Sequence, residues 1–209
     1  MSQPTARLID VAPPGDPDAS RGEFWISNAW RVPSTDRNLS AYEPNQVFLN
    51  ISRTRFAEIG HLTTANSDGD GRGVMVADIN GDLQPDLLVR HSGGGPLRVY
   101  ANRFPPASRL VVSLDGTKSN RLGIGATIIA EVGDRQITRQ MFPTNNYVTS
   151  QASEVRFGLG QASQVARLVV RWPSGTVQDF RSVPAGVHIR ITEDESEFQV
   201  LLGQQPEIS

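Results

Sequence analysis

Cysteine is absent from this 209-residue sequence, so the fold owes nothing to disulfides and can form in either redox environment. Histidine is scarce, and His61, His91 and His188 do not stand at metal-ligand spacing, which argues against a zinc site. Neither charge is in excess, because 20 Lys and Arg residues stand against 22 Asp and Glu residues. This balance gives no bulk attraction to nucleic acid or to an anionic membrane.

Long apolar runs are also missing. No segment approaches the about 18 apolar residues of a membrane span, and the polar start Met-Ser-Gln-Pro-Thr-Ala lacks the apolar core of a signal peptide. We therefore expect either an intracellular chain or one whose leader and upstream region lie outside this sequence. The repeat count given below favours the second option, so secretion or display at the cell surface is the expected localisation and the cytoplasm is the alternative.

The most informative segment that is present is an acidic loop at residues 78–86. Its string Asp-Ile-Asn-Gly-Asp-Leu-Gln-Pro-Asp places side-chain oxygens at positions one, three, five and nine of a tight turn. Ca²⁺ takes six to eight oxygen ligands, and short side chains at such positions can point inward together. We predict a structural calcium site formed by Asp78, Asn80, Asp82, the carbonyl of Gln84, and Asp86. An acidic turn that binds nothing is the alternative, because these residue types favour turns.

The loop does not fit an EF-hand, which needs Gly at position six, Glu at position twelve and flanking helices. Here these positions are Leu83 and Val89, and the flanking segments at 74–78 and 87–90 are typical of strands. We therefore expect a strand-loop-strand site. A second cation at Asp68 or Asp70 is less favoured than an acidic turn that leads into the first strand.

Residues 73–89 resemble the FG-GAP or VCBS repeat, the calcium-loop blade unit of integrin-like β-propellers. Leu83 departs from that repeat, which usually has Gly there, so some backbone strain is expected.

Four later blocks resemble the ASPIC/UnbV domain in order and spacing, namely 116–126, 147–151, 157–160 and 170–175. The pairing, over residues 45–193, resembles the cartilage acidic protein 1-like family. This resemblance implies an all-β chain in which partial propeller blades at 1–105 precede a small β-sandwich or barrel at 106–209.

The first part is too short to close a propeller, since propellers need four to eight blades of about 40 to 50 residues. Strands are expected at 46–50 and 55–59, with an earlier one at 23–28, and in a second blade at 74–78, 87–90 and 97–101. The chain thus resembles the carboxy-terminal part of a longer propeller protein. The alternative is a minimal relative that protects its blade edges by self-association.

The second part contains seven short β-rich runs separated by turn signals, which favours a compact sandwich or barrel around Phe157 and Trp172. The runs lie at 109–114, 126–132, 136–142, 154–157, 166–172, 177–180 and 187–192. The resemblance implies that loops 117–125 and 145–151 form the distinctive surface of this domain. Candidate ligand-binding residues there are Lys118, Asn120, Arg121, Asn146 and Tyr147. The alternative is that the Asn residues shape turns and that Tyr147 packs inside.

These features favour a calcium-binding, non-catalytic interaction module of extracellular type, as in cell adhesion, whose partner is a protein or a polysaccharide surface. Two other functions stay open. One is an accessory part of an enzyme, with a cleft between the domains and Asp70, His91 or His188 as acid-base groups. The other is a structural cap on the last blade of a larger propeller.

Overall fold

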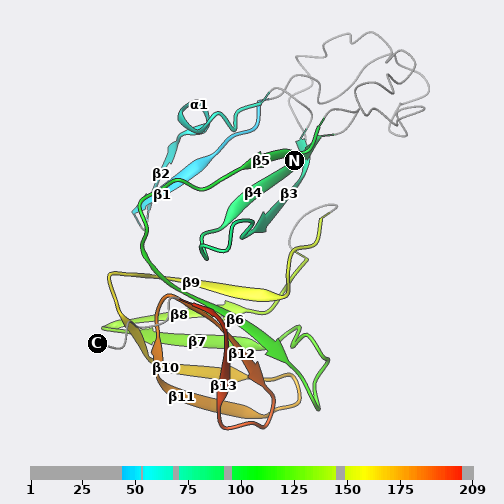
Figure 1. Cartoon of the computed structure of the whole chain (residues 1–209), viewed down its shortest axis with the longest axis vertical. Coiled ribbons are helices and arrows are strands. Elements are labelled where there is room, and N and C mark those ends of the chain that lie inside the picture. Colours follow the sequence, from blue (N-terminus) through cyan, green and yellow to red (C-terminus); the bar gives the residue numbers. More distant parts are fainter. Residues whose placement is uncertain (1–43, 53, 68–70, 92–95, 145–148, 204–209) are drawn as a thin grey trace, which may run out of the picture. The chain divides into compact units, whose positions relative to one another are not determined.

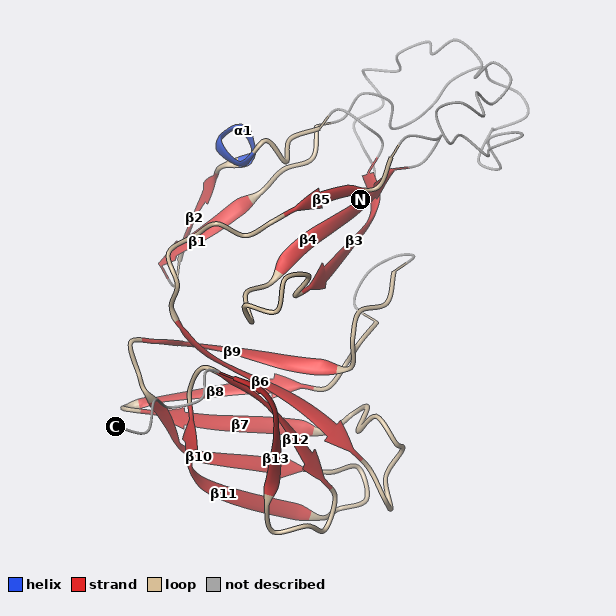
Figure 2. Cartoon of the chain, in the orientation of Figure 1, coloured by secondary structure: helices blue, strands red, loops and turns tan. Residues whose placement is uncertain are grey.

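The structure is a computed structural model, and it describes residues 44–52, 54–67, 71–91, 96–144 and 149–203. Strands dominate these residues, as Figure 2 shows, and a short helix is also present. The all-β class predicted from the sequence is therefore confirmed. The strand expected at 23–28 lies outside the described residues. Whether the sheets of the first part are propeller blades stays a prediction.

The chain divides into two compact units. Unit 1 consists of Met1–Met75 and Leu87–Tyr100, and unit 2 consists of Val76–Asp86 and Ala101–Ser209. The acidic loop at 78–86 therefore groups with unit 2. The division at residue 105 that the resemblance implies stays a prediction.

The strands that precede the long C-terminal part form two small sheets. Strands β1 (Phe48–Ser52) and β2 (Arg55–Glu58) pair as an antiparallel hairpin, followed by the single-turn helix α1 (Gly60–Thr63). A three-stranded sheet has the order β3-β4-β5 and is formed by Gly71–Ala77, Asp86–His91 and Arg98–Tyr100. Strands therefore occur at each of the five described positions predicted for this part, with shifts at their ends. All five side chains of β1 are exposed.

Unit 2 contains two four-stranded sheets (Figure 1). One has the order β13-β12-β6-β9 and the other β11-β10-β7-β8. The strand bounds are β6 Ser108–Asp115, β7 Thr127–Val132, β8 Arg135–Gln140, β9 Glu154–Gly160, β10 Gln164–Arg171, β11 Val177–Pro184, β12 Val187–Thr192 and β13 Phe198–Gly203. All pairs are antiparallel except β12 with β6, which run parallel. The seven predicted strands are present as β6 to β12, and β13 was not predicted.

The core of unit 2 follows from alternation of side chains along its strands. On β12, Val187, Ile189 and Ile191 are buried, whereas the residues between them are more exposed. Successive strand residues point to opposite faces, so this period of two buries one face of each sheet. Phe157 and Trp172 lie in the same core cluster, as predicted. The rings of Phe180 on β11 and Phe198 on β13 meet edge to face and link the two sheets.

In the part of the chain that the structure describes, no helix has the length and apolar character needed to cross a membrane.

Candidate functional site

The acidic loop between β3 and β4 is curled by hydrogen bonds to its own main chain. The first carboxylate, Asp78, accepts the N–H groups of Gly81 and Asp82 through Oδ1, at 2.8 and 3.2 Å, and that of Leu83 through Oδ2, at 2.7 Å. Both oxygens of this side chain therefore bond main-chain donors. The Asp side chain acts here as it does in many tight turns, where it satisfies N–H groups that have no other partner.

The middle of the loop is held by contacts among the predicted ligands themselves. Asp82 accepts the N–H of Gln84 at 2.7 Å and the side-chain amide of Asn80 at 2.9 Å. The bond from Asn80 lowers the pKa of Asp82 most, and the bond from the N–H of Gln84 lowers it further. The structure thus brings Asn80, Asp82 and Gln84 together, with amide donors facing the carboxylate.

The last predicted ligand, Asp86, is the buried end of the loop, with only 2% of its surface exposed. Its Oδ2 accepts the N–H of Ile79 at 3.0 Å, and its Oδ1 accepts the N–H of Asn102 at 2.7 Å. One carboxylate therefore closes the loop and also fixes the segment that leads into β6. A buried carboxylate needs such donors, because its desolvation is otherwise costly.

Two further features of the loop bear on its predicted strain and metal binding. Leu83 has φ +64°, in the left-handed region that Gly adopts easily, and its side chain is buried. This agrees with the strain expected at that position. Among the described residues, no group of three or more His, Cys, Asp and Glu side chains is placed to hold a metal ion. The five ligands stay a prediction, because the carboxylates as arranged face N–H donors.

Two arginines of unit 2 also bond this loop. Arg109 donates to the carbonyl of Asp82 at 3.2 Å, and Arg156 donates to the carbonyl of Leu83 at 3.0 Å. The side chains of both arginines come from strands of one sheet, β6 and β9. The loop conformation therefore depends on residues that lie far from it in sequence.

The second candidate site is the loop between β6 and β7, whose shape is set by close backbone packing. Gly116 donates its N–H to the carbonyl of Arg121, and a Cβ at Gly116 would lie 2.3 Å from the carbonyl oxygen of Asn120. The side chain of Asn120 donates to the carbonyl of Ile124 and accepts its N–H, both at 2.8 Å. These contacts close the loop upon itself.

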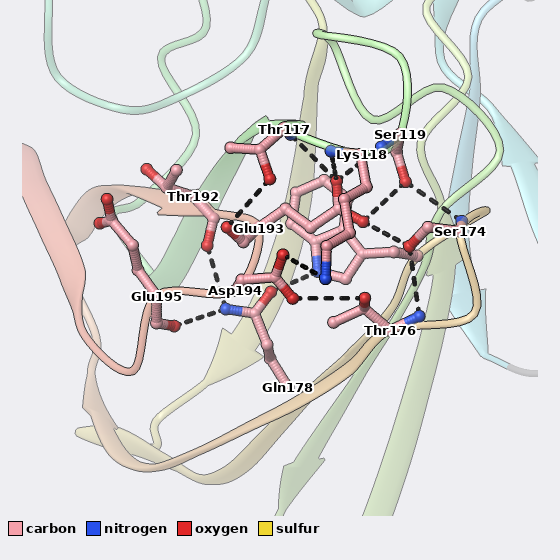
Figure 3. A network of polar contacts seen from close by, with 11 residues as sticks. Thr117, Lys118, Ser119, Ser174, Thr176, Gln178, Thr192, Glu193, Asp194 and Glu195 are labelled. Carbon is pink, nitrogen blue, oxygen red and sulfur yellow. Dashed lines mark hydrogen bonds and ion pairs between the residues drawn. The ribbon is translucent and has the colours of Figure 1, made fainter.

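A buried glutamate, Glu193, joins this loop to two others (Figure 3). Its Oε2 accepts three successive N–H groups, from Thr117 at 3.0 Å, Lys118 at 2.8 Å and Ser119 at 2.7 Å. Its Oε1 accepts the hydroxyl of Ser119 at 2.9 Å and that of Ser174. One carboxylate thus ties together the loop after β6, the turn between β10 and β11, and the turn between β12 and β13.

Contacts around Glu193 extend the same connection. Thr176 lies 3.4 Å from Asp194, and the side-chain amide of Gln178 donates to the carbonyls of Thr192 and Glu195. Lys118 forms an exposed ion pair with Asp194 at 2.9 Å. These contacts connect the segments 116–125, 172–176 and 193–197, which we together call the loop platform; Figure 3 shows the polar contacts that join them.

The charge state of Glu193 follows from its surroundings. Burial raises its pKa, but the hydrogen bonds from Ser119, Ser174 and Lys118 outweigh that effect and lower the pKa to about 2. Donors that bond a carboxylate favour its charged form. Glu193 is therefore ionised at neutral pH, and the connection between the three loops does not depend on protonation there.

The predicted ligand-binding residues have different places in the loop platform. Lys118 and Arg121 are exposed, and Lys118 pairs with Asp194, which raises the pKa of Lys118. Asn120 is exposed too, but its side chain bonds Ile124 and shapes the loop. Asn146 and Tyr147 lie outside the described residues.

Sequence reasoning missed Glu193, Ser119 and Ser174. A signal for Glu193 was present, because the inward period of Val187, Ile189 and Ile191 continues to position 193. An acidic residue on the inward face of a strand end must find several donors. The identity of those donors, in a loop 74 or more positions away and in a turn 19 positions away, has no local signal.

The residues proposed for the enzyme alternative do not all lie in the same unit. His91 belongs to unit 1 and His188 to unit 2, and Asp70 lies outside the described residues. The Nε2 atom of His188 lies 2.8 Å from the hydroxyl of Ser113 and 3.9 Å from a carboxylate oxygen of Glu154. Burial lowers the pKa of His188, opposed in part by Glu154.

Comparisons with known proteins agree with part of the predicted resemblance. The family model described as ASPIC and UnbV matches residues 116–198, and this range includes all three segments of the loop platform. The chain is also similar to cartilage acidic protein 1 of Xenopus tropicalis, with 25% identity over 191 residues. That match covers 89% of this chain and 28% of the relative, so the chain spans less than a third of the relative's length. The FG-GAP or VCBS repeat stays a prediction.

Proposed function

We propose that this chain is a non-catalytic interaction module of extracellular type, and that the loop platform is its contact surface. The observation that carries the proposal is the Glu193 network, which holds three loops together by hydrogen bonds at one end of unit 2. Binding to a surface that is already ordered costs less conformational entropy than binding to mobile loops. A preorganised group of loops on a packed scaffold is therefore well suited to recognition.

The side chains that the loop platform exposes suit a contact role. Lys118 and Arg121 are exposed cations, and Leu122 and Ile124 are exposed apolar residues, at 47% and 39%. Apolar side chains on a loop contribute little to folding when they face water, whereas they gain free energy when a partner covers them. The proposed partner is a protein or a polysaccharide at a cell surface, and the proposed localisation is secreted or surface-bound. The similarity to part of cartilage acidic protein 1 supports this proposal.

The polar cluster around His188 favours the non-catalytic proposal over an acyl-transfer enzyme. In Ser-His-Asp sites the carboxylate orients the ring through one nitrogen while the other takes the serine proton. Here Glu154 and Ser113 both face Nε2. The serine and the carboxylate thus approach the same nitrogen, and Glu154 is too far from it for a hydrogen bond, so this arrangement supports a structural contact among β6, β9 and β12.

The experiment compares two double variants of the full chain for binding to arrayed polysaccharides and to cell-surface proteins of the source organism. Lys118→Ala with Arg121→Ala removes two cations from the loop platform. Arg135→Ala with Arg139→Ala removes two exposed cations from β8 and is the matched control. We expect only the first variant to lose binding, with both melting temperatures close to that of the wild type, because exposed changes usually alter stability within about 0.5 kcal/mol. If both variants bind equally well, the loop platform is not part of the contact surface.

We also propose that the loop at 78–86 binds Ca²⁺ through the residues predicted above. The spacing of its oxygens and the curl imposed by Asp78 support this proposal. Binding requires Asp78 and Asp82 to turn part of their oxygens from N–H donors toward the ion, which would resolve the repulsion between nearby carboxylates. When bound, the ion would supply positive charge that organises the loop, with no open position for a substrate.

Calcium binding is tested by melting the wild type and Asp82→Ala with chelator and with about 2 mM Ca²⁺. A dissociation constant of about 10⁻⁴ M predicts a stabilisation of about 1.8 kcal/mol for the wild type. The variant should show a much smaller shift. No shift in the wild type would refute the calcium site without affecting the proposal for the loop platform, because the Glu193 network contains no residue of the acidic loop.

A further inference from the structure

The Glu193 network has the form of a binding site. Three consecutive N–H groups, from Thr117, Lys118 and Ser119, converge on one oxygen, and the hydroxyls of Ser119 and Ser174 bond the other. Successive N–H groups that face the same point form a concavity that binds anions. The five donors face both oxygens of the carboxylate, which together can accept about four hydrogen bonds, so they saturate the charged group.

The concavity is held in shape by contacts that do not involve Glu193. The N–H of Gly116 bonds the carbonyl of Arg121 at 2.9 Å, and the N–H of Gly123 bonds the carbonyl of Asn120 at 2.8 Å. The two bonds between Asn120 and Ile124 close the other side of the loop. The backbone of residues 117–119 is therefore fixed at both of its ends by the loop itself.

Glu193 reaches this concavity from another part of the chain, directly after the end of β12. The covalent connection between them runs through 74 to 76 residues, so it adds little to the local geometry of the bonds. In this sense the donors form a binding site and the carboxylate is its ligand, although both belong to the same chain.

We infer that residues 117–119 together with Ser174 form a preorganised carboxylate-binding site, which Glu193 fills from within the chain and which a small free carboxylate occupies when that side chain is removed. The ligand class follows from the donors, because two groups of donors on opposite oxygens match a planar carboxylate. A spherical anion such as chloride can meet only one of the two groups.

The size of the ligand follows from the substitution used to open the site. Glu193→Ala removes the group CH₂–COO⁻, which corresponds to acetate, whereas Glu193→Gly also removes the Cβ and corresponds to propionate. Acetate should therefore suit the first variant, and propionate the second. The wild type should respond to neither, since its site is filled.

The experiment measures melting temperatures of the full chain in acetate, in propionate and in chloride at equal ionic strength. In Glu193→Ala, acetate at about ten times its dissociation constant should raise the ratio of folded to unfolded protein about tenfold relative to chloride. Glu193→Gly should prefer propionate. The matched control adds Ser119→Ala and Ser174→Ala to Glu193→Ala, which removes the hydroxyl donors and should weaken the response to acetate.

Equal shifts in acetate and chloride, equal shifts in the wild type, or no shift in Glu193→Ala would each overturn the inference. The last result would mean that Glu193 creates the concavity rather than fills it. Should Glu193→Ala fail to fold in chloride, refolding in acetate is measured instead, where recovery supports the site and its absence refutes it. Amide NMR signals of residues 117–119 that move on addition of acetate to Glu193→Ala would locate the bound ligand.

Discussion

Replacement of Gly123 by Ala should destabilise unit 2 more than the same change at Gly133, which has a similar backbone conformation. Gly123 has φ +63° and Gly133 has φ +59°, so both substitutions place a Cβ in the left-handed region. That region costs an L-residue about 1 to 2 kcal/mol. The two sites differ in their surroundings, because a Cβ at Gly133 would meet nothing within 4 Å, whereas at Gly123 it would lie 2.6 Å from Cδ1 and 2.7 Å from Cβ of Leu114.

The contact with Leu114 determines how much stability is lost when Gly123 is replaced by Ala. Leu114 is a core residue, 5% exposed, and its own Cβ is fixed to the backbone of β6, so it cannot move aside freely. Overpacking of a core typically costs about 1 to 3 kcal/mol. We therefore expect Gly133→Ala to lower the unfolding free energy by about 1 to 2 kcal/mol and Gly123→Ala to lower it by about 2 to 5 kcal/mol.

The assay is equilibrium urea unfolding followed by the fluorescence of Trp172, which is buried in the core of unit 2. Trp25 and Trp30 are replaced by Phe in all variants, so that Trp172 is the sole reporter. Hydrogen exchange of the amides of residues 117–119 is measured in parallel and should increase in Gly123→Ala only. Equal losses of stability in the two variants would refute the reasoning, because they would mean that Leu114 moves away from the new Cβ without any loss of stability.

Three other predictions concern unit 2. Glu193 has a pKa lowered from 4.5 to about 2, so its charge adds stability above about pH 4.5 that is lost as the pH falls toward 2. Urea unfolding from neutral to acid pH should accordingly show the advantage of the wild type over Glu193→Gln shrinking in that range, and a constant difference would contradict the assigned pKa. Phe157→Ala should cost about 3 to 5 kcal/mol, because it leaves a cavity in the core, and a loss below about 1 kcal/mol would contradict the packing described. Asn120→Ala should lower the unfolding free energy by about 1 to 3 kcal/mol through the loss of two hydrogen bonds, whereas an unchanged melt would favour a role in ligand binding alone.

Much of unit 2 could be predicted from the sequence because its strands alternate. Val187, Ile189 and Ile191 illustrate this, since a buried face on a strand leaves a period of two in the chain. Strand β13 was missed for the converse reason. Its residues Phe198–Gly203 are mostly exposed and its pairing with β12 includes an irregularity, so no alternating pattern marks it.

The candidate sites were less predictable, because they depend on contacts between distant segments. The sequence places oxygens at fixed positions of the loop at 78–86, but the direction of each carboxylate depends on the loop backbone, which Arg109 and Arg156 contact through the carbonyls of Asp82 and Leu83. Glu193 shows the same limit, since an acidic residue near a strand end is usually exposed unless donors from elsewhere surround it. Those donors come from a loop and a turn whose meeting is a property of the fold.

The parallel pairing of β12 with β6 has a consequence for how unit 2 is assembled. Leu110 on β6 pairs with Val187, so the centre of this sheet joins residues that are 77 positions apart. Contacts of such long range form late and slow the folding of β proteins. Until β12 has been synthesised and has docked, β6 is an edge strand whose open side can pair with another chain. A chain that ended before Val187 would therefore retain β6, β9 and the second sheet, yet we expect it to aggregate rather than to remain a smaller folded domain.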